Sequence, residues 1–377
     1  MELLLHQWGD WPELYRNTDK TEATEIVIID SQMNYRGKLD TYWHTLSLFK
    51  RLIHGLYLTS GDMMHFLFKL IKWLIILVLF AALSLGFYAG NLSYEELFNA
   101  PWDRILGIEN HRLDLGRIHG LEERYGWQRV MVPSKDGTEL RGTYIETVKG
   151  GRKAVVLLHG LYQNRSMCVP YISMYQDMGY NVLLVDLRGH GESGGGHTDW
   201  GIHDVDDMNA WVDFLRSKNP SMEIGFHGIS LGAAMALIYS GSAEGQHMKF
   251  YVADSSYGNL LALGRDKIMT YTGDDRLVLG MDVLNPFMQA AMFFHTGRIL
   301  SDVDPAFQVT RMSSPVLFLH GGADMLVPPS VAHELLADSS SSVKELYIFD
   351  GAAHTMEMAV NGPAYKQVVQ KFVKQRS

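Results

Sequence analysis

One serine stands between two glycines in the segment His227–Gly232, which reads HGISLG. A serine hydroxyl can attack a carbonyl carbon when a neighbouring base takes its proton. The pattern Gly-x-Ser-x-Gly is typical of a sharp strand-to-helix turn that exposes such a serine. Glycine makes up 36 of the 377 residues, so the pentapeptide alone decides little. The interpretation of Ser230 therefore depends on the elements around it and on its partners.

The segments on both sides of Ser230 predict the turn that the motif requires. Residues 222–227 read as a strand, and residues 231–240 read as an apolar helix. Gly228 and Gly232 fit this turn because its backbone closes too tightly for Cβ atoms. We expect the Ser230 hydroxyl to project beyond the carboxyl end of the strand, at a helix N-terminus, where negative charge is favoured.

The base for this serine must come from the 16 histidines of the chain. His354 lies in the small-residue loop DGAAHTMEM, directly after the predicted strand 344–350. Active sites of α/β proteins assemble from loops at the carboxyl ends of strands. His333 falls inside a predicted helix, so His354 is the predicted base. Three further histidines end predicted strands and are expected to be packed or hydrogen-bonded: His159, His227 and His320.

The histidine needs an acid that fixes its tautomer and stabilises the imidazolium. Asp324 lies in the segment LHGGADMLVPP after the predicted strand 315–320, in a loop that two glycines and two prolines make rigid. Asp254 and Asp186 also end predicted strands and are the alternatives. Two backbone N–H groups must also stabilise the oxyanion. Leu231, next to the serine, and Leu161, after the segment LLHG, are predicted to supply them.

From residue 127 onward, apolar runs alternate with helical patterns. The segment 127–146 predicts two strands around a Lys-Asp-Gly turn. Six further apolar runs predict strands: 154–160, 180–186, 222–228, 249–254, 315–321 and 344–350. Strands that alternate with helices predict an α/β fold with a mostly parallel sheet and helices on both faces.

Residues 66–88 predict a transmembrane helix. No charge occurs from Trp73 to Tyr88, and 23 helical residues would span about 34 Å. A buried core helix and a cleaved signal peptide are the alternatives. Lysines and arginines are more frequent before this segment than after it, which places the N-terminus in the cytoplasm and the rest of the chain outside. We therefore expect a single-pass signal-anchor in the cell membrane, with the catalytic domain on the extracytoplasmic side.

The chain divides further by composition. Residues 1–62 carry no interpretable motif and either precede the true start or form a small cytoplasmic segment. Residues 91–126 are expected to be a linker, and residues 127–377 the catalytic domain. Within it, residues 257–312 are too long for a simple crossover and predict a small helical cap. Its methionines and phenylalanines either line an acyl-binding channel or pack the cap onto the domain: Met269, Met281, Phe287, Met288, Met292, Phe293 and Phe294.

Charge and composition exclude several other classes. Hydrophobic residues are 47% and charged residues 20% of the chain, as in globular proteins. A net charge of −9 argues against nucleic-acid binding. Cys168 is the single cysteine, which excludes an intramolecular disulfide and a cysteine-rich metal site. No metal or organic cofactor is expected.

Five segments together resemble the α/β-hydrolase family over residues 127–376: LLHGLYQN, VDLRGHGES, GISLG, HGGADMLVP and GAAHTME. They occur in the family order Ser, Asp, His. The branch that this chain resembles contains the monoacylglycerol lipases, lysophospholipases and serine aminopeptidases, and includes membrane-anchored bacterial proteins. The resemblance implies a catalytic triad of Ser230, His354 and Asp324.

These observations predict a serine hydrolase that cleaves carboxylic esters of small-molecule or lipid-like substrates through an acyl-enzyme. A serine peptidase or amidase is the enzymatic alternative, because the same triad cleaves amides. A non-catalytic membrane-anchored scaffold is the alternative from another class, because fold alone does not establish function. No protein partner is predicted.

Overall fold

The computed structural model describes residues 46–48, 50, 51 and 61–376. The interpretations of residues 1–62 therefore fall almost entirely outside the described residues. The chain divides into two units, residues 1–78 and residues 79–377. Helix α2, Gly61–Asn99, contains 39 residues and includes the predicted transmembrane segment.

An eight-stranded sheet forms the centre of the second unit, in the order β1-β2-β4-β3-β5-β6-β7-β8. Strand β2 pairs antiparallel with β1 and β4, and all pairs from β4 to β8 are parallel. The fold class and the predicted N-terminal hairpin are confirmed. The strands are β1 (Gln128–Pro133), β2 (Glu139–Ile145), β3 (Lys153–Leu158), β4 (Asn181–Val185), β5 (Glu223–Ile229), β6 (Phe250–Asp254), β7 (Val316–Gly321) and β8 (Lys344–Phe349).

The central strands β3 to β7 are buried on both faces, which explains their continuous apolar runs, whereas the edge strands β1 and β8 keep exposed residues. Along β3, Ala154, Val156 and Leu158 belong to one hydrophobic cluster. The alternating residues Val155 and Leu157 belong to a second cluster. Successive side chains of a strand point to opposite faces, so the sheet separates two cores.

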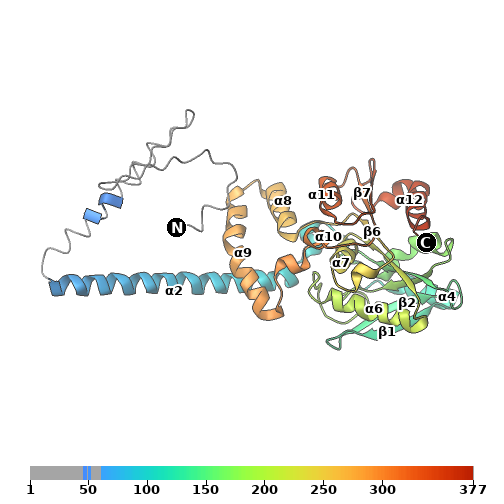
Figure 1. The fold of residues 1–377 in the computed structure, drawn as a ribbon, viewed down its shortest axis with the longest axis horizontal. Coiled ribbons are helices and arrows are strands. Elements are labelled where there is room, and N and C mark those ends of the chain that lie inside the picture. Colours follow the sequence, from blue (N-terminus) through green and yellow to red (C-terminus); the bar gives the residue numbers. More distant parts are fainter. Residues whose placement is uncertain (1–45, 49, 52–60, 377) are drawn as a thin grey trace, which may run out of the picture. The chain divides into compact units, whose positions relative to one another are not determined.

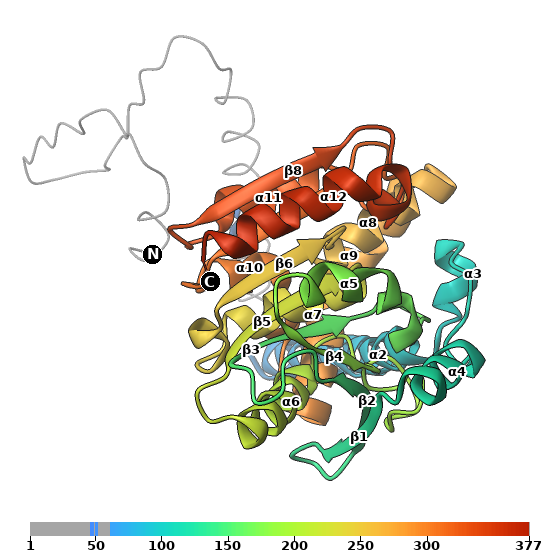
Figure 2. The same ribbon diagram turned by 90° about the vertical axis from the view of Figure 1, so that its right-hand side faces the viewer.

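Helices cover each of these cores (Figure 2). One core includes residues from α6 (Asp204–Lys218), α7 (Leu231–Ser240) and α11 (Ser330–Asp338). The other includes residues from η2 (Arg165–Tyr171), α5 (Ile172–Gln176), α4 (Gly116–Tyr125) and α12 (Glu357–Lys374). This three-layer arrangement exposes the carboxyl ends of the parallel strands at one edge, where loops can form a site.

Two helices are inserted between β6 and β7 (Figure 1). They are α8 (Leu260–Thr272) and α9 (Asp275–Thr296), and Arg265 of α8 forms an ion pair with Asp282 of α9. The shorter helices η4 (Leu300–Val303) and α10 (Pro305–Val309) lead back to the sheet. We refer to α8 and α9 together as the cap.

Helix α9 packs closely on the C-terminal part of α2. A Cβ atom on Gly86 or Gly90 would lie 2.5 or 2.4 Å from atoms of Phe287. The spacing Gly-x-x-x-Gly therefore allows the two helices to approach more closely than larger residues would permit. Helix α3 (Trp102–Leu106) follows α2.

By length and composition alone, two helices in the described part of the chain could cross a membrane. They are Met63–Asn99 and Asp275–Thr296. The sequence predicts the first of these but not the second. Core helices and signal sequences can have the same composition, so membrane insertion stays a prediction.

Candidate active site

Ser230 occupies a sharp turn between β5 and α7. It is the single residue between the end of the strand and the first helical residue, and its φ is 54° and its ψ −115°. A Cβ on Gly228 would lie 2.1 Å from the Gly232 carbonyl oxygen. A Cβ on Gly232 would lie 2.4 Å from the Leu158 carbonyl oxygen. The glycines flanking Ser230 therefore permit a backbone that no larger residue could follow.

The structure brings the three sequence-predicted polar side chains into one hydrogen-bonded chain. Ser230 Oγ lies 2.8 Å from His354 Nε2, and His354 Nδ1 lies 2.7 Å from Asp324 Oδ2. The carboxylate fixes the tautomer, with the proton on Nδ1 and a free acceptor at Nε2. This geometry allows His354 to accept the proton of the serine hydroxyl.

The loops that carry the histidine and the acid are bonded to each other. Asp324 follows β7 and His354 follows β8. The Ala323 N–H donates to the Ala352 carbonyl at 2.9 Å, and the Gly322 N–H donates to the Phe349 carbonyl at 2.8 Å. These bonds fix the distance between the two loops and thus between the two side chains.

Asp324 is buried and fully hydrogen-bonded. Its Oδ1 accepts the N–H groups of Leu326 and Val327, each at 2.8 Å. Burial alone would raise the pKa of Asp324, but hydrogen bonds from His320 and His354 outweigh burial and hold the pKa below its usual value. The carboxylate therefore stays ionised at the pH of most assays.

His320 also belongs to this site, although the sequence predicted only that it is packed or hydrogen-bonded. Its Nε2 donates to the Val327 carbonyl at 2.8 Å and lies 3.3 Å from Asp324 Oδ2. Burial lowers the pKa of His320, but the contact with Asp324 raises it more. Its place in the sequence, at the end of β7 and four residues before Asp324, was the one feature that could have indicated a contact between His320 and the acid.

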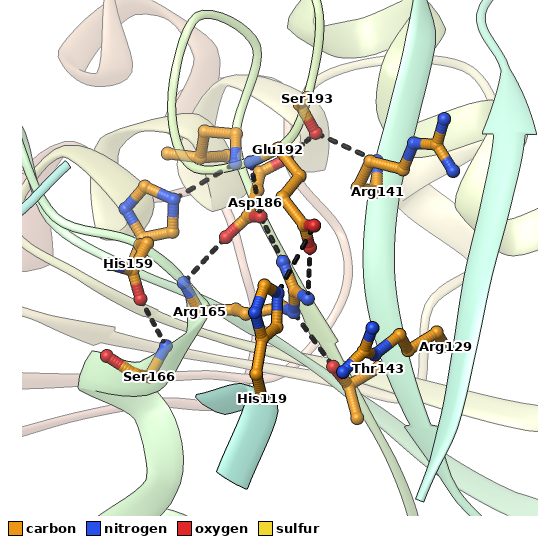
Figure 3. A network of polar contacts seen from close by, with 12 residues as sticks. His119, Arg129, Arg141, Thr143, His159, Arg165, Ser166, Asp186, Glu192 and Ser193 are labelled. Carbon is orange, nitrogen blue, oxygen red and sulfur yellow. Dashed lines mark hydrogen bonds and ion pairs between the residues drawn. The ribbon is translucent and has the colours of Figure 1, made fainter. Parts of the chain in front are cut away.

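The alternative acids lie in other networks. The Asp254 backbone carbonyl accepts the Ser230 N–H at 2.7 Å, while its carboxylate accepts the Tyr365 hydroxyl at 2.6 Å. The Asp186 carboxylate is paired with Arg165 (Figure 3). Of the three carboxylates, only that of Asp324 bonds to His354 within the described residues.

The two backbone groups predicted to hold the oxyanion are free in the described part of the chain. Neither the Leu161 N–H nor the Leu231 N–H makes a hydrogen bond there. The next N–H, that of Tyr162, donates to His190 Nε2 at 3.1 Å, and Tyr162 has a φ of 56°. Burial lowers the pKa of His190 to about 3, so the ring is neutral and can accept this bond.

A buried arginine, Arg165, lies at the centre of the polar network drawn in Figure 3 and follows the loop that carries Leu161. Arg165 forms ion pairs with Asp186, with Glu122 at 3.0 Å and with Glu192 at 2.5 Å. Its Nε donates to Thr143 Oγ1 at 2.8 Å. The network therefore connects η2, the loop after β4, strand β2 and helix α4 at a point four residues from the predicted oxyanion group.

A mostly apolar cavity of about 340 Å³ opens beside Ser230 and His354. Lys267 of the cap also lines this cavity, and its Nζ donates to the Met325 carbonyl at 2.9 Å. The Tyr257 hydroxyl also belongs to a lining residue; it is buried and has no partner among the described residues. An apolar lining with only a few polar groups is typical of small-molecule sites.

The methionines and phenylalanines of the cap do not form the acyl-binding channel that the composition of the cap suggested. Of the methionines and phenylalanines named above, Met281 alone lines the cavity. Phe287 packs against α2, and Phe294 makes an edge-to-face contact with Phe87 at 5.8 Å. These two aromatics therefore pack the cap against α2, outside residues 127–377, which neither expectation included. Helical spacing could not show which face of α9 meets which neighbour.

A hydrogen-bonded Ser–His–Asp chain at the carboxyl edge of a mostly parallel sheet, with helices inserted before β7, is typical of the α/β-hydrolase fold. Comparison with known proteins agrees. A family model described as "alpha/beta hydrolase fold" matches residues 153–274. A second, described as "Serine aminopeptidase, S33", matches residues 288–359. The chain belongs to the α/β-hydrolase superfamily.

The matches to two curated relatives span most of the length of each relative. The uncharacterized protein YqkD of Bacillus subtilis (strain 168) is 30% identical over 244 residues, which are 64% of this chain and 78% of that protein. The AB hydrolase superfamily protein YisY of the same organism is 26% identical over 245 residues, which are 56% of this chain and 88% of that protein. Among solved structures, the esterase Pf2001 of Pyrococcus furiosus has a TM-score of 0.54 and 25% identity, and the match covers 68% of this chain and 95% of that one. The superfamily and this esterase neighbour support hydrolase activity.

Proposed function

We propose that this protein is a serine esterase that cleaves carboxylic esters of apolar acyl groups. The observation that carries the proposal is the hydrogen-bonded chain Ser230–His354–Asp324 beside an apolar cavity. Similarity to an esterase of known structure is consistent with it. No cofactor is needed for this chemistry.

In the proposed mechanism, Ser230 Oγ attacks the ester carbonyl while its proton moves to His354 Nε2. The N–H groups of Leu161 and Leu231 hold the negative oxygen of the tetrahedral intermediate. The intermediate collapses to an acyl-serine, and the alcohol leaves with the proton from His354. Water then attacks the acyl-serine and loses a proton to His354. The second tetrahedral intermediate collapses, the bond to Ser230 Oγ breaks, and His354 returns the proton to Ser230 Oγ as the acid leaves. Asp324 keeps the histidine oriented and stabilises its charged form.

Activity-based labelling tests this proposal. A fluorophosphonate probe should label the wild-type chain, and Ser230→Ala should abolish labelling. Ser217→Ala, which removes an exposed hydroxyl on α6, is the matched control and should label normally. Absence of labelling in the wild type would favour the non-catalytic scaffold.

A serine peptidase or amidase is the second candidate, because the serine-aminopeptidase model matches residues 288–359, which include Asp324 and His354. A panel of p-nitrophenyl esters beside aminoacyl anilides separates the two activities. Faster turnover of the esters supports the esterase. Faster turnover of the anilides supports the peptidase and overturns the ester assignment.

We also propose that residues 66–88 anchor the enzyme in a membrane, with residues 127–377 on the extracytoplasmic side. The charge-free stretch from Trp73 to Tyr88 and the lysines before it support this topology. Protease added to intact cells should digest the hydrolase domain. A domain that stays intact until the cells are lysed would contradict the proposed orientation.

A further inference from the structure

The segment before the hydrolase sheet forms part of the wall of the cavity. Residues 97–108 span the end of α2, helix α3 and the turn after it, and they precede residue 153, where the first family-model match begins. Five residues of this segment line the cavity: Leu97, Trp102, Ile105, Leu106 and Ile108. We call residues 97–108 the wall segment.

The wall segment is attached to the hydrolase domain through Trp200, with Trp102 of the wall segment packed beside it. The Leu97 carbonyl accepts the indole N–H of Trp102 at 2.9 Å and that of Trp200 at 2.8 Å. The two rings meet edge to face with centroids 5.8 Å apart. Trp200 is buried, has a φ of 54° and also lines the cavity. The end of α2 is therefore attached to the loop that precedes α6.

The residues that follow the wall segment are bonded to the loop that carries Leu161. The His111 N–H donates to the Tyr162 carbonyl at 2.9 Å. Asn164 Nδ2 donates to the carbonyls of His111 at 2.8 Å and Asp114 at 2.9 Å. The chain from Leu97 to Asp114 thus lines the cavity with apolar side chains and is hydrogen-bonded, through His111 and Asp114, to the predicted oxyanion loop.

The chemistry of the wall segment suits a hydrocarbon chain. All five lining side chains are apolar, and the one polar atom among them, the Trp102 indole nitrogen, already donates to Leu97. A volume of about 340 Å³ lies at the lower end of the range for ligand pockets. A cavity of this size favours a single acyl chain over a bulkier diacyl ligand.

We infer that the wall segment binds the acyl chain of the ester substrate and limits its length. This inference rests on the proposed esterase function. It assigns specificity to residues that lie outside the family-model matches, and it makes the C-terminal end of α2 part of the substrate site.

The acyl-length profile tests the inference. We compare kcat/KM for p-nitrophenyl acetate, butanoate, octanoate and dodecanoate in the full chain. In the wild type, each added methylene that reaches the wall should raise kcat/KM about threefold to fourfold. Leu106→Trp, which narrows the cavity, should lower the dodecanoate-to-acetate ratio of kcat/KM by about tenfold or more. Ile108→Ala, which widens it, should move the optimum toward longer chains.

Leu113→Trp is the matched control, because Leu113 is exposed and lies just beyond the wall segment. It should leave the ratio unchanged. Equal ratios in the wild type, Leu106→Trp and Ile108→Ala would overturn the inference. A thermal unfolding midpoint near that of the wild type shows that each variant is folded.

A binding measurement separates failure of the inference from failure of the proposed function. In Ser230→Ala, dodecanoate should quench the fluorescence of Trp102 and Trp200, and Leu106→Trp should weaken its binding about tenfold. Such binding supports the inference that the wall segment binds the acyl chain, even if the wild type hydrolyses no ester. Binding that Leu106→Trp leaves unchanged overturns the inference even if Ser230 labels with fluorophosphonate.

Discussion

His320 and Asp324 lie within 3.3 Å of each other, and His320 Nε2 approaches the carboxylate oxygen that also accepts the hydrogen bond from His354. One oxygen atom therefore faces two imidazole rings. The His320 ring is oriented by its bond to the Val327 carbonyl. Asp324 raises the pKa of His320 above its usual value, which favours the positively charged form of this second ring. A positive charge on His320 would partly cancel the negative charge of the Asp324 carboxylate to which His354 is hydrogen-bonded.

Replacing His320 should change the pH dependence of catalysis. Glutamine is neutral, and its amide can still donate to the Val327 carbonyl. In His320→Gln, the full negative charge of Asp324 acts on His354 and favours its protonated form, so the acidic limb of kcat/KM should move to higher pH. Asp324 and Glu357 are the charged groups that raise the His320 pKa, and both remain in the variant.

The pH–rate profile measures this effect directly. His333→Gln, an exposed substitution on α11, serves as the control and should keep the wild-type profile. If His320→Gln lowers activity by the same factor at every pH, the role of His320 is packing alone.

Replacing Asp324 should leave the site assembled but slow. The amide introduced by Asp324→Asn can hold His354 in the wrong tautomer, and in a comparable serine-hydrolase substitution kcat falls by about 10⁴-fold. We expect Asp324→Asn to lower kcat by about 10³-fold to 10⁴-fold. Asp254→Asn tests the alternative acid, because Asp254 contacts Tyr365 rather than His354, and its loss should stay below about tenfold. Equal losses in both variants would contradict the assignment of the acid.

Local sequence patterns predicted most of the sheet and the central residues of the site. The strands around Ser230, Asp324 and His354 are continuous apolar runs, and each of the three residues follows a strand within a few positions. In a parallel sheet, that order alone places such residues at one edge. The prediction needed no knowledge of distant contacts.

The remaining features depend on contacts between segments far apart in the chain. The Leu97 carbonyl meets Trp200, 103 residues later, and no periodicity in residues 91–126 indicates this contact. The side chain of Phe287 is apolar in either environment, so composition could not show that it faces α2 rather than the cavity. The wall segment and the packing of the cap therefore became apparent only in the structure.

The buried carboxyl of Asp254 should make stability fall as the pH rises above the pKa that this carboxyl has in the unfolded chain. Burial raises its pKa well above the usual value, and the neighbouring Glu357 raises it further. The folded chain keeps a proton that the unfolded chain releases above about pH 4. Stability is therefore fully present below the unfolded pKa and is lost as pH rises through the folded pKa.

Asp254→Asn removes this proton linkage, because an amide accepts the Tyr365 hydroxyl without ionising. The variant should lose less unfolding free energy than the wild type between about pH 5 and about pH 9. Urea unfolding, followed by tryptophan fluorescence at each pH, measures this unfolding free energy. Glu334→Gln, on the exposed side of α11, should keep the wild-type slope. A wild-type slope in Asp254→Asn would contradict the linkage.

Removing the charge of Arg165 should destabilise the domain strongly. The variant Arg165→Met fills the space of the side chain but leaves Asp186 buried without its cation and Glu122 paired with Arg129 alone. We expect the unfolding free energy to fall by about 3–5 kcal/mol, measured by urea denaturation. Arg129→Met is the control, because the half-exposed Arg129 contacts Glu122 from the solvent side, and its cost should stay near about 1 kcal/mol. Similar losses of unfolding free energy in the two variants would show that the buried ion pairs of Arg165 contribute no more to stability than the half-exposed pair of Arg129. Fluorophosphonate labelling of folded Arg165→Met should also slow, because Arg165 holds the loop that carries Leu161.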